Sequence, residues 1–121
     1  MTTAVILLSH GSRAVDARTV LEAYRMMLEK SCSYDFVATA SLQFNQPDLP
    51  ATVEEMIKKG AQRIVVAPLF LYQGRHVQDD IPEIVQRERE KYPEVELVLA
   101  SNIGADERVA QVIMDRIREV C

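Results

Sequence analysis

The 121-residue sequence predicts an α/β fold: a four-stranded parallel sheet with helices on both of its faces. Short apolar segments rich in β-branched residues alternate four times with longer segments whose apolar residues recur at helical spacing. The connections between these segments are short, and this order favours parallel strands joined by right-handed crossovers. The length predicts one domain over residues 1–121, with a single core.

The composition excludes several classes of partner. A net charge of −4 and the absence of a basic block argue against nucleic acid. No apolar run approaches the roughly 20 residues that cross a membrane, and the N-terminus reads as a strand and not as a signal peptide. Cys32 and Cys121 belong to no ligand or disulfide spacing, so we expect a cytoplasmic protein with two unpaired thiols.

The first half of the chain reads as two strand–helix units. A strand over residues 3–9 precedes a helix over residues 15–30, and a strand over residues 35–43 precedes a helix over residues 49–59. Asp48 can cap the second helix and Gly60 can end it. The first helix carries an apolar stripe of Ala17, Val20, Leu21, Tyr24, Met27 and Leu28.

The second half begins with the apolar run 64–71, which predicts a strand buried on both faces. The chain then breaks at Gly74 and carries His76 in a loop. We expect a third helix over residues 80–91 with Asp80 as its cap, because Pro82 and Glu83 follow as in a capping box.

The remaining elements are a strand over residues 96–100 and a helix over residues 106–120. This last helix carries an apolar stripe of Val109, Val112, Ile113, Ile117 and Val120.

All four strand-to-helix connections of such a sheet lie at one edge, where His10, Gln43, His76 and Asn102 should gather. Two neutral imidazoles can hold Co²⁺, Ni²⁺, Fe²⁺ or Zn²⁺. Two protein ligands are too few for a closed structural site, so they favour a labile site from which the metal is passed on. The arginines that flank the histidines, Arg13 and Arg75, can pair with substrate carboxylates.

Other interpretations of these loops stay open. A histidine beside a glycine turn is often an ordinary hydrogen-bonded loop residue. Gly11 and Gly74 can cradle a phosphate at a helix N-terminus, although no G-x-G-x-x-G or Walker lysine is present. Ser12 beside His10 could indicate a hydrolase, but the sequence lacks a G-x-S-x-G elbow.

Two segments together resemble a known family. The strand that ends in His10-Gly-Ser-Arg13, combined with Val66-Ala-Pro-Leu-Phe-Leu-Tyr-Gln-Gly-Arg-His-Val-Gln-Asp-Asp-Ile-Pro82, resembles the small single-domain sirohydrochlorin cobaltochelatases. These are short-form class II tetrapyrrole chelatases. Ile103-Gly-Ala-Asp-Glu-Arg108 and Met114-Asp-Arg116 resemble the archaeal-type members. The match runs from residue 4 to residue 118, and the fold it implies is a flavodoxin-like chelatase half-domain.

The resemblance implies that a divalent metal is inserted into sirohydrochlorin, in cobalamin or sirohaem-type tetrapyrrole biosynthesis. It favours Co²⁺, with Ni²⁺ and Fe²⁺ as further candidates, and it requires no organic cofactor. His10 and His76 match the two metal-binding histidines of the family and are expected to be the catalytic residues. The expected substrate contacts are Ser12, Arg13, Gln43, Gly74 and Arg75.

One departure from the family concerns the proton acceptor. Gln43 and Gln46 stand where the family often has glutamates, and an amide can coordinate a metal but cannot take a proton. A non-catalytic metal or tetrapyrrole carrier of the same fold is therefore the alternative, followed by a phosphate-ligand enzyme. Longer chelatases resemble two such domains fused, so we expect a homodimer with its cleft between protomers.

Overall fold

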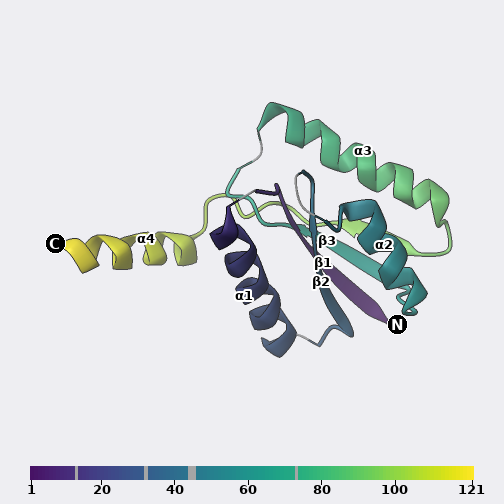
Figure 1. Ribbon diagram of the computed structural model, residues 1–121, viewed down its shortest axis with the longest axis horizontal. Coiled ribbons are helices and arrows are strands. Elements are labelled where there is room, and N and C mark those ends of the chain that lie inside the picture. The colour runs from purple at the N-terminus through teal and green to yellow at the C-terminus, as the bar shows by residue number, and fades with distance from the viewer. Residues whose placement is uncertain (13, 32, 44–45, 73) are drawn as a thin grey trace.

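A computed structural model describes residues 1–12, 14–31, 33–43, 46–72 and 74–121, and for residues 75–77 it describes the backbone but not the side chains. The described residues form four strands and four helices in strict alternation (Figure 1). In chain order these are β1 (Thr3–Ser9), α1 (Val15–Ser31), β2 (Phe36–Ser41), α2 (Leu49–Lys58), β3 (Arg63–Pro68), α3 (Arg75–Lys91), β4 (Glu96–Leu99) and α4 (Glu107–Val120).

The predicted parallel sheet is confirmed, with the strand order β2-β1-β3-β4. At its centre, Ile6 of β1 lies between Ala38 of β2 and Val66 of β3. Figure 1 shows α2 and α3 on one face of the sheet and α1 on the other. The connection after β1 thus leads to a helix on one face of the sheet, and the connection after β3 leads to a helix on the other face. The carboxyl ends of these two strands therefore border the crevice in which open α/β sheets bind ligands.

The core lies between the sheet and the pair α2 and α3. Ala4, Ile6 and Leu8 point to this face at every second position of β1, and all three are fully buried. Residues of the other strands, of both helices and of the turn between α2 and β3 complete the cluster: Ala40, Leu49, Val53, Met56, Ala61, Ile64, Val66, Ile81, Val85 and Leu97.

The residues predicted to begin and end α2 do so in the structure. Asp48 accepts a hydrogen bond from the backbone N–H of Ala51 at 2.9 Å. Gly60 follows the C-cap with φ +102°, a conformation that favours glycine, and its N–H donates to the carbonyl of Ile57. These local interactions hold the helix between two turns that connect it to β2 and β3.

The prediction that the third helix begins at Asp80 is wrong. The helix α3 begins at Arg75, and its first described bond runs from the N–H of Gln78 to the carbonyl of Gly74 at 3.0 Å. Pro82 therefore lies inside the helix and removes the bond to the carbonyl of Gln78. The helix continues because Gln78 is exposed to water, whereas Ile81 is fully buried against the core. His76 thus belongs to the first turn of a helix and not to a loop.

The third strand is also shorter than the predicted run 64–71, because it ends at Pro68. Proline has no N–H with which to continue a ladder. The chain beyond it is held by other bonds: the N–H of Leu69 donates to Leu8, and the carbonyl of Phe70 accepts from Ile103. This arrangement carries the chain from β3 towards the start of α3.

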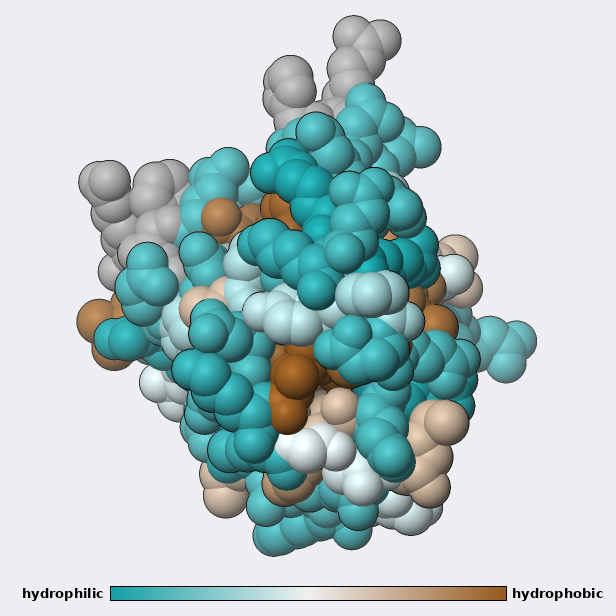
Figure 2. Space-filling view, turned by 90° about the vertical axis from the view of Figure 1, so that its right-hand side faces the viewer, coloured by the Kyte–Doolittle hydropathy of each residue, from teal (hydrophilic) through white to brown (hydrophobic). Residues whose placement is uncertain are grey.

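Two helices leave apolar residues exposed. No residue of the predicted stripe of α1 is fully buried, and its members Val20, Tyr24 and Met27 are exposed. The helix α4 extends away from the sheet in Figure 1. The opposite side of the molecule, which faces the viewer in Figure 2, is mainly hydrophilic with one small hydrophobic hollow. Among the described residues, no helix has both the length and the apolar character needed to cross a membrane.

Candidate functional site

The loops that follow β1 and β2 are in direct contact at the carboxyl edge of the sheet. The N–H of Gln43 donates to the carbonyl of His10 at 3.0 Å. Gly11 has φ +99°, and a Cβ at this position would lie 1.8 Å from the carbonyl oxygen of Gln43. Only glycine fits this contact, so the glycine after His10 is what allows the two loops to approach.

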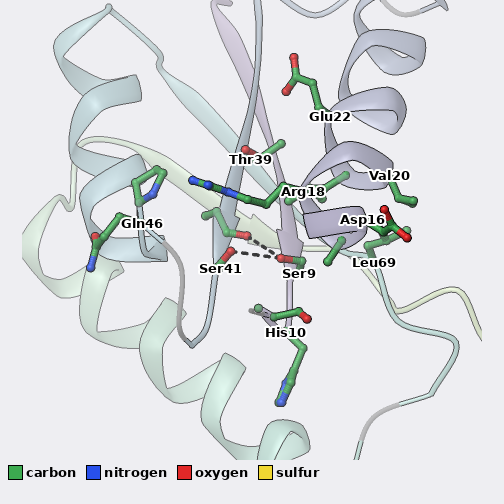
Figure 3. Close-up of a pocket in the computed structure, with 16 residues that line it drawn as sticks. Ser9, His10, Asp16, Arg18, Val20, Glu22, Thr39, Ser41, Gln46 and Leu69 are labelled. Carbon is green, nitrogen blue, oxygen red and sulfur yellow. Dashed lines mark hydrogen bonds between the residues drawn. The ribbon is translucent and has the colours of Figure 1, made fainter. Parts of the chain in front are cut away.

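The ring of His10 projects from this contact towards the segment that follows β3. It packs edge-on against the ring of Phe70, with centroids 6.3 Å apart and an angle of 72° between the planes. In Figure 3 the ring points away from the side chains of Ser9 and Ser41. None of the described residues forms a hydrogen bond with the ring nitrogens, so His10 is available to a ligand.

A cavity of 620 Å³ lies beside His10, between α1 and the carboxyl ends of β1 and β2. The hydroxyl oxygens of Ser9 and Ser41 are 3.2 Å apart in its wall (Figure 3). Its volume is within the range of pockets that hold drug-sized ligands. Further lining residues are Gly11, Ser12, Asp16, Ala17, Arg18, Val20, Leu21, Glu22, Thr39, Ala40, Gln46, Pro47 and Leu69.

Arg18 supplies a positive charge among the described residues that line this cavity, and the sequence did not predict it. Figure 3 shows its side chain extending from α1 across the cavity. No described residue pairs with its guanidinium. In the sequence, an arginine on a helix surface is most simply interpreted as exposed to solvent. The one sequence feature that pointed to the site was the position of Arg18 in the first turn of the helix that follows His10.

The charge of Glu22, on the rim of the same cavity, is compensated. Its carboxylate accepts hydrogen bonds from Nε and Nη2 of Arg25 at 2.9 and 2.7 Å. These bonds hold the pKa of the Glu22 carboxyl below its usual range. Arg25 also pairs with Glu29. Glu22 is therefore already paired with Arg25, and the guanidinium of Arg18 can attract an anionic group of a ligand.

Gln43 lines a second, smaller hollow of 130 Å³ together with Asp80 and Glu83 of α3. Carboxylates thus lie close to the amide that the sequence placed at the edge of the sheet. Among the described side chains, no group of three or more histidine, cysteine, aspartate or glutamate residues is arranged to hold a metal ion.

Two of the residues expected at this edge have structural contacts. Ser12 Oγ accepts a hydrogen bond from the N–H of Ala14 at 3.1 Å and lines the large cavity. The side-chain amide of Asn102 donates to the carbonyl of Leu71 at 3.1 Å, which ties the loop after β4 to the segment after β3. Asn102 therefore supports the edge of the sheet.

The remaining expected residues lie at the start of α3 and in the first loop. Gly74 is the N-cap of α3 and has extended backbone angles. Arg75 and His76 begin the helix, but their side chains lie outside the described residues, as does the whole of Arg13. The structure thus brings His10, Ser12 and Gln43 together. For His76 it places only the backbone, in the first turn of α3.

Large apolar side chains are exposed at the same edge. Leu71 and Tyr72, between β3 and α3, are 52% and 82% exposed, and Val15 at the start of α1 is 78% exposed. Isolated exposed apolar residues are common, but several at the edge that carries a cavity indicate a surface for a large apolar ligand or a partner.

Comparison with known proteins gives a consistent result. A family model described as CbiX matches residues 4–120. A sirohydrochlorin cobaltochelatase of Methanococcus aeolicus is 29% identical, and the match covers 93% of this chain and 96% of the relative. A sirohydrochlorin ferrochelatase of Priestia megaterium is 32% identical over 96% of this chain but only 44% of the relative.

Two crystal structures have a similar fold. The cobalamin biosynthesis CbiX protein of Marinobacter aquaeolei VT8 superposes with a TM-score of 0.82 at 28% identity, covering 98% of this chain and 94% of the other. The sirohydrochlorin chelatase SirB of Bacillus subtilis subspecies spizizenii, in complex with cobalt, has a TM-score of 0.92 at 28% identity. That match covers 99% of this chain and 51% of SirB, so about half of SirB has no counterpart here.

Proposed function

The chain belongs to the CbiX family, and from this premise we propose that it is a sirohydrochlorin metal chelatase. The observation that carries the proposal is the position of His10. It lies at the carboxyl end of β1, at the crevice between β1 and β3, where no described residue forms a hydrogen bond with its ring nitrogens and a 620 Å³ cavity lies beside it. Relatives at about this length and at twice this length are named for insertion of metal into sirohydrochlorin.

The reaction places two demands on the residues of the site. The divalent metal must be held weakly enough to leave, and two pyrrole N–H protons must depart as the metal binds the four ring nitrogens. A site with His10 and His76 as its protein ligands meets the first demand. Once the metal has been transferred, the freed imidazole of His10 can accept one of the protons, and the other is released to solvent.

The macrocycle requires apolar surface and cations. Sirohydrochlorin is a large conjugated ring that carries carboxylates, and the exposed Leu71 and Tyr72 supply apolar surface at the edge of the site. Arg18 supplies a positive charge inside the cavity and pairs with one of the carboxylates. Ser12, Arg13, Gln43, Gly74 and Arg75 remain the other proposed substrate contacts.

The glutamines are the feature that favours the alternative function, a metal or tetrapyrrole carrier without turnover. Gln43 adjoins His10, and its amide cannot accept a proton. We propose that Asp80 and Glu83, which line the same hollow as Gln43, supply the negative charge that assists proton removal. A nearby acceptor of protons is what a chelatase needs and a carrier does not, so these two carboxylates favour the chelatase.

We propose Co²⁺ as the preferred metal. The cobaltochelatase of M. aeolicus matches over nearly its whole length, whereas the ferrochelatase of P. megaterium matches over less than half of its own. We further propose that the active unit is a homodimer and that it works in the cytoplasm, where Cys32 and Cys121 stay reduced.

The test is an absorbance time course of sirohydrochlorin with limiting protein and Co²⁺, Fe²⁺ or Ni²⁺. The wild type, His10→Ala, His76→Ala and Asp80→Asn are compared with a reaction without protein. Lys58→Ala is the control variant, because Lys58 lies on the exposed surface of α2. We expect many turnovers per site, fastest with Co²⁺, a loss of nearly all activity in either histidine variant and slower insertion in Asp80→Asn.

Each failure has a distinct meaning. Binding of metal or tetrapyrrole without turnover would establish the carrier instead. Turnover that survives in His10→Ala would remove His10 from the reaction, and faster insertion with Fe²⁺ than with Co²⁺ would reverse the proposed metal preference.

A further inference from the structure

The ring of His10 is restrained by packing where a hydrogen bond would be expected. A histidine that binds metal usually donates its second ring N–H to a carboxylate, a carbonyl or a water, and this bond fixes the orientation of the ring. Among the described residues, none forms such a bond with His10. The contact that they do provide is the edge-on packing of Phe70, whose ring centroid lies 6.3 Å away, within the range of favourable aromatic pairs.

The register of the sheet places Phe70 beside His10. Leu8 of β1 pairs with Pro68 of β3. The N–H of Leu69 donates to the carbonyl of Leu8 at 2.8 Å, so the two chains stay side by side beyond this last pair. His10 and Phe70 follow one alternation further along the two chains. Because side chains alternate between the faces of a sheet, both continue the core face, which bears α2 and α3.

The same alternation explains why the ring of His10 points away from Ser9 and Ser41 in Figure 3. Ser9 and Ser41 are paired across β1 and β2, and they point to the face that bears α1 and the large cavity. The ring of His10 lies on the other face, where α3 begins with His76 in its first turn. Phe70 thus restrains the ring on the side of the sheet that carries the second expected metal ligand.

The backbone that carries Phe70 is itself held in place. Its carbonyl accepts a hydrogen bond from the N–H of Ile103 at 2.8 Å. The next carbonyl, that of Leu71, accepts from the N–H of Gly104 and from the side-chain amide of Asn102 at 2.9 and 3.1 Å. The side chain of Phe70 packs against the hydrophobic core. A ring that is fixed through both its backbone and its side chain can restrain a neighbouring ring.

We propose that Phe70 is a positioning residue, which keeps the imidazole of His10 in the orientation that binds the divalent metal. A histidine without this restraint samples three χ1 rotamers and two orientations of its ring. The apparent metal affinity falls in proportion to the population of the orientation that binds, so losing the restraint costs about a factor of three to six. The inference rests on the proposed role of His10 as a metal ligand.

Packing in place of a hydrogen bond also suits release of the metal. A carboxylate bonded to the second ring nitrogen raises the basicity of a histidine ligand and strengthens its bond to the metal. Phe70 orients the ring of His10 without adding a charge or a hydrogen-bond acceptor. The metal therefore stays exchangeable, as its transfer to a tetrapyrrole requires.

Phe70→Leu and Phe36→Leu form a matched pair of variants. Both phenylalanines are partly buried against the core, but Phe36 lies at the start of β2, at the opposite edge of the sheet from His10. Phe70→Tyr keeps the aromatic ring and is the conservative variant. Titration with Co²⁺ alone, followed by the visible absorbance of the bound ion, gives the dissociation constant of each protein, with His10→Ala as the reference. Circular dichroism verifies that each variant is folded.

We expect the dissociation constant for Co²⁺ to rise about three- to sixfold in Phe70→Leu and to stay within about twofold of the wild type in Phe36→Leu and Phe70→Tyr. In steady-state insertion, KM for Co²⁺ should rise by the same factor in Phe70→Leu. KM for sirohydrochlorin should stay unchanged, because Phe70 acts through His10. A purely structural role of the two phenylalanines would instead affect both leucine variants alike.

The proton resonances of the His10 ring test the contact in the metal-free protein. They should shift in Phe70→Leu, because the ring current of Phe70 is lost, and keep their positions in Phe36→Leu. A nuclear Overhauser contact between the two rings of the wild type tests the geometry without any substitution, and its absence contradicts the proposal.

The titration has two further outcomes that overturn the inference: an unchanged dissociation constant in Phe70→Leu, and an equal rise in Phe36→Leu. A rise confined to KM for sirohydrochlorin overturns it as well, because Phe70 would then be a substrate contact. Wild-type insertion kinetics in Phe70→Leu would overturn it and leave the proposed function intact. Absence of insertion by the wild type would remove the proposed function, while the Co²⁺ titration and the ring resonances would still decide the role of Phe70.

Discussion

Single residues at the carboxyl edge set the geometry of the candidate site. Gly11 permits the loops after β1 and β2 to touch, since any side chain there would collide with the carbonyl of Gln43. This contact sets the direction from which His10 projects towards Phe70. Arg18 depends on the same arrangement, because the wall that it faces is formed by β1 and β2.

Replacing Arg18 should affect substrate binding more than turnover. In Arg18→Gln the side chain keeps hydrogen-bond donors but loses its charge, so we expect KM for sirohydrochlorin to rise about tenfold, with a smaller change in kcat. Steady-state kinetics with saturating Co²⁺ measures both parameters. Lys58→Gln removes a charge from the far surface and should leave KM unchanged; an equal rise there would indicate a general effect of net charge.

At the scale of the element, helix ends are controlled by a few polar contacts. Asp48 caps α2 by accepting the N–H of Ala51, and Asp106 caps α4 by accepting the N–H of Arg108. The guanidinium of Arg108 adds two further bonds to the carboxylate of Asp106, at 2.9 and 2.8 Å. In α3, by contrast, the cap is Gly74, and none of the described side chains forms a capping hydrogen bond.

The cap of α4 should depend on pH. The guanidinium and the N–H of Arg108 hold the pKa of Asp106 well below its usual value of 3.8. The ionised form is therefore favoured in the folded state, and its contribution to α4 is complete above the usual pKa and is lost as pH falls through the lowered one. We expect the amide resonance of Arg108 to titrate only at strongly acidic pH.

Asp106→Asn provides the comparison, because it keeps an oxygen acceptor for the cap and removes the titrating group. In this variant the transition of the Arg108 amide should disappear. A transition of the wild type near the usual pKa of an aspartate would show that the pair with Arg108 is not formed in solution.

The whole molecule is held by one core and not by α4. Ile6 is fully buried in the central strand, between Ala38 and Val66, and under α2 and α3. The body should therefore unfold as a unit with this core, whereas α4 contributes little to it because none of its residues is buried.

Ile6→Val should lower the free energy of unfolding by about 0.5–1.5 kcal/mol, since it removes one buried methylene. Chemical denaturation at a fixed protein concentration measures the change. Val15→Ala removes more apolar surface from a residue that is 78% exposed, and it should change stability by less than about 0.5 kcal/mol. Equal effects of the two substitutions would contradict the proposed location of the core.

Local patterns alone determined much of this protein. Alternating β-branched runs and helical periodicity predicted the four strands, the four helices and the parallel sheet, because both patterns reflect burial of one segment at a time. The position of His10 after the first strand follows from the same reading, and so do the caps at Asp48 and Gly60.

Only the tertiary structure decided how these parts meet. The strand order, the early start of α3 and the course of α4 depend on contacts between distant segments: the burial of Ile81 extends a helix through Pro82, and bonds to the segment after β3 direct α4 outwards. Arg18 became part of the site for the same reason. A charged residue on a helix looks solvated in the sequence until the strands that form the opposite wall of its cavity are in place.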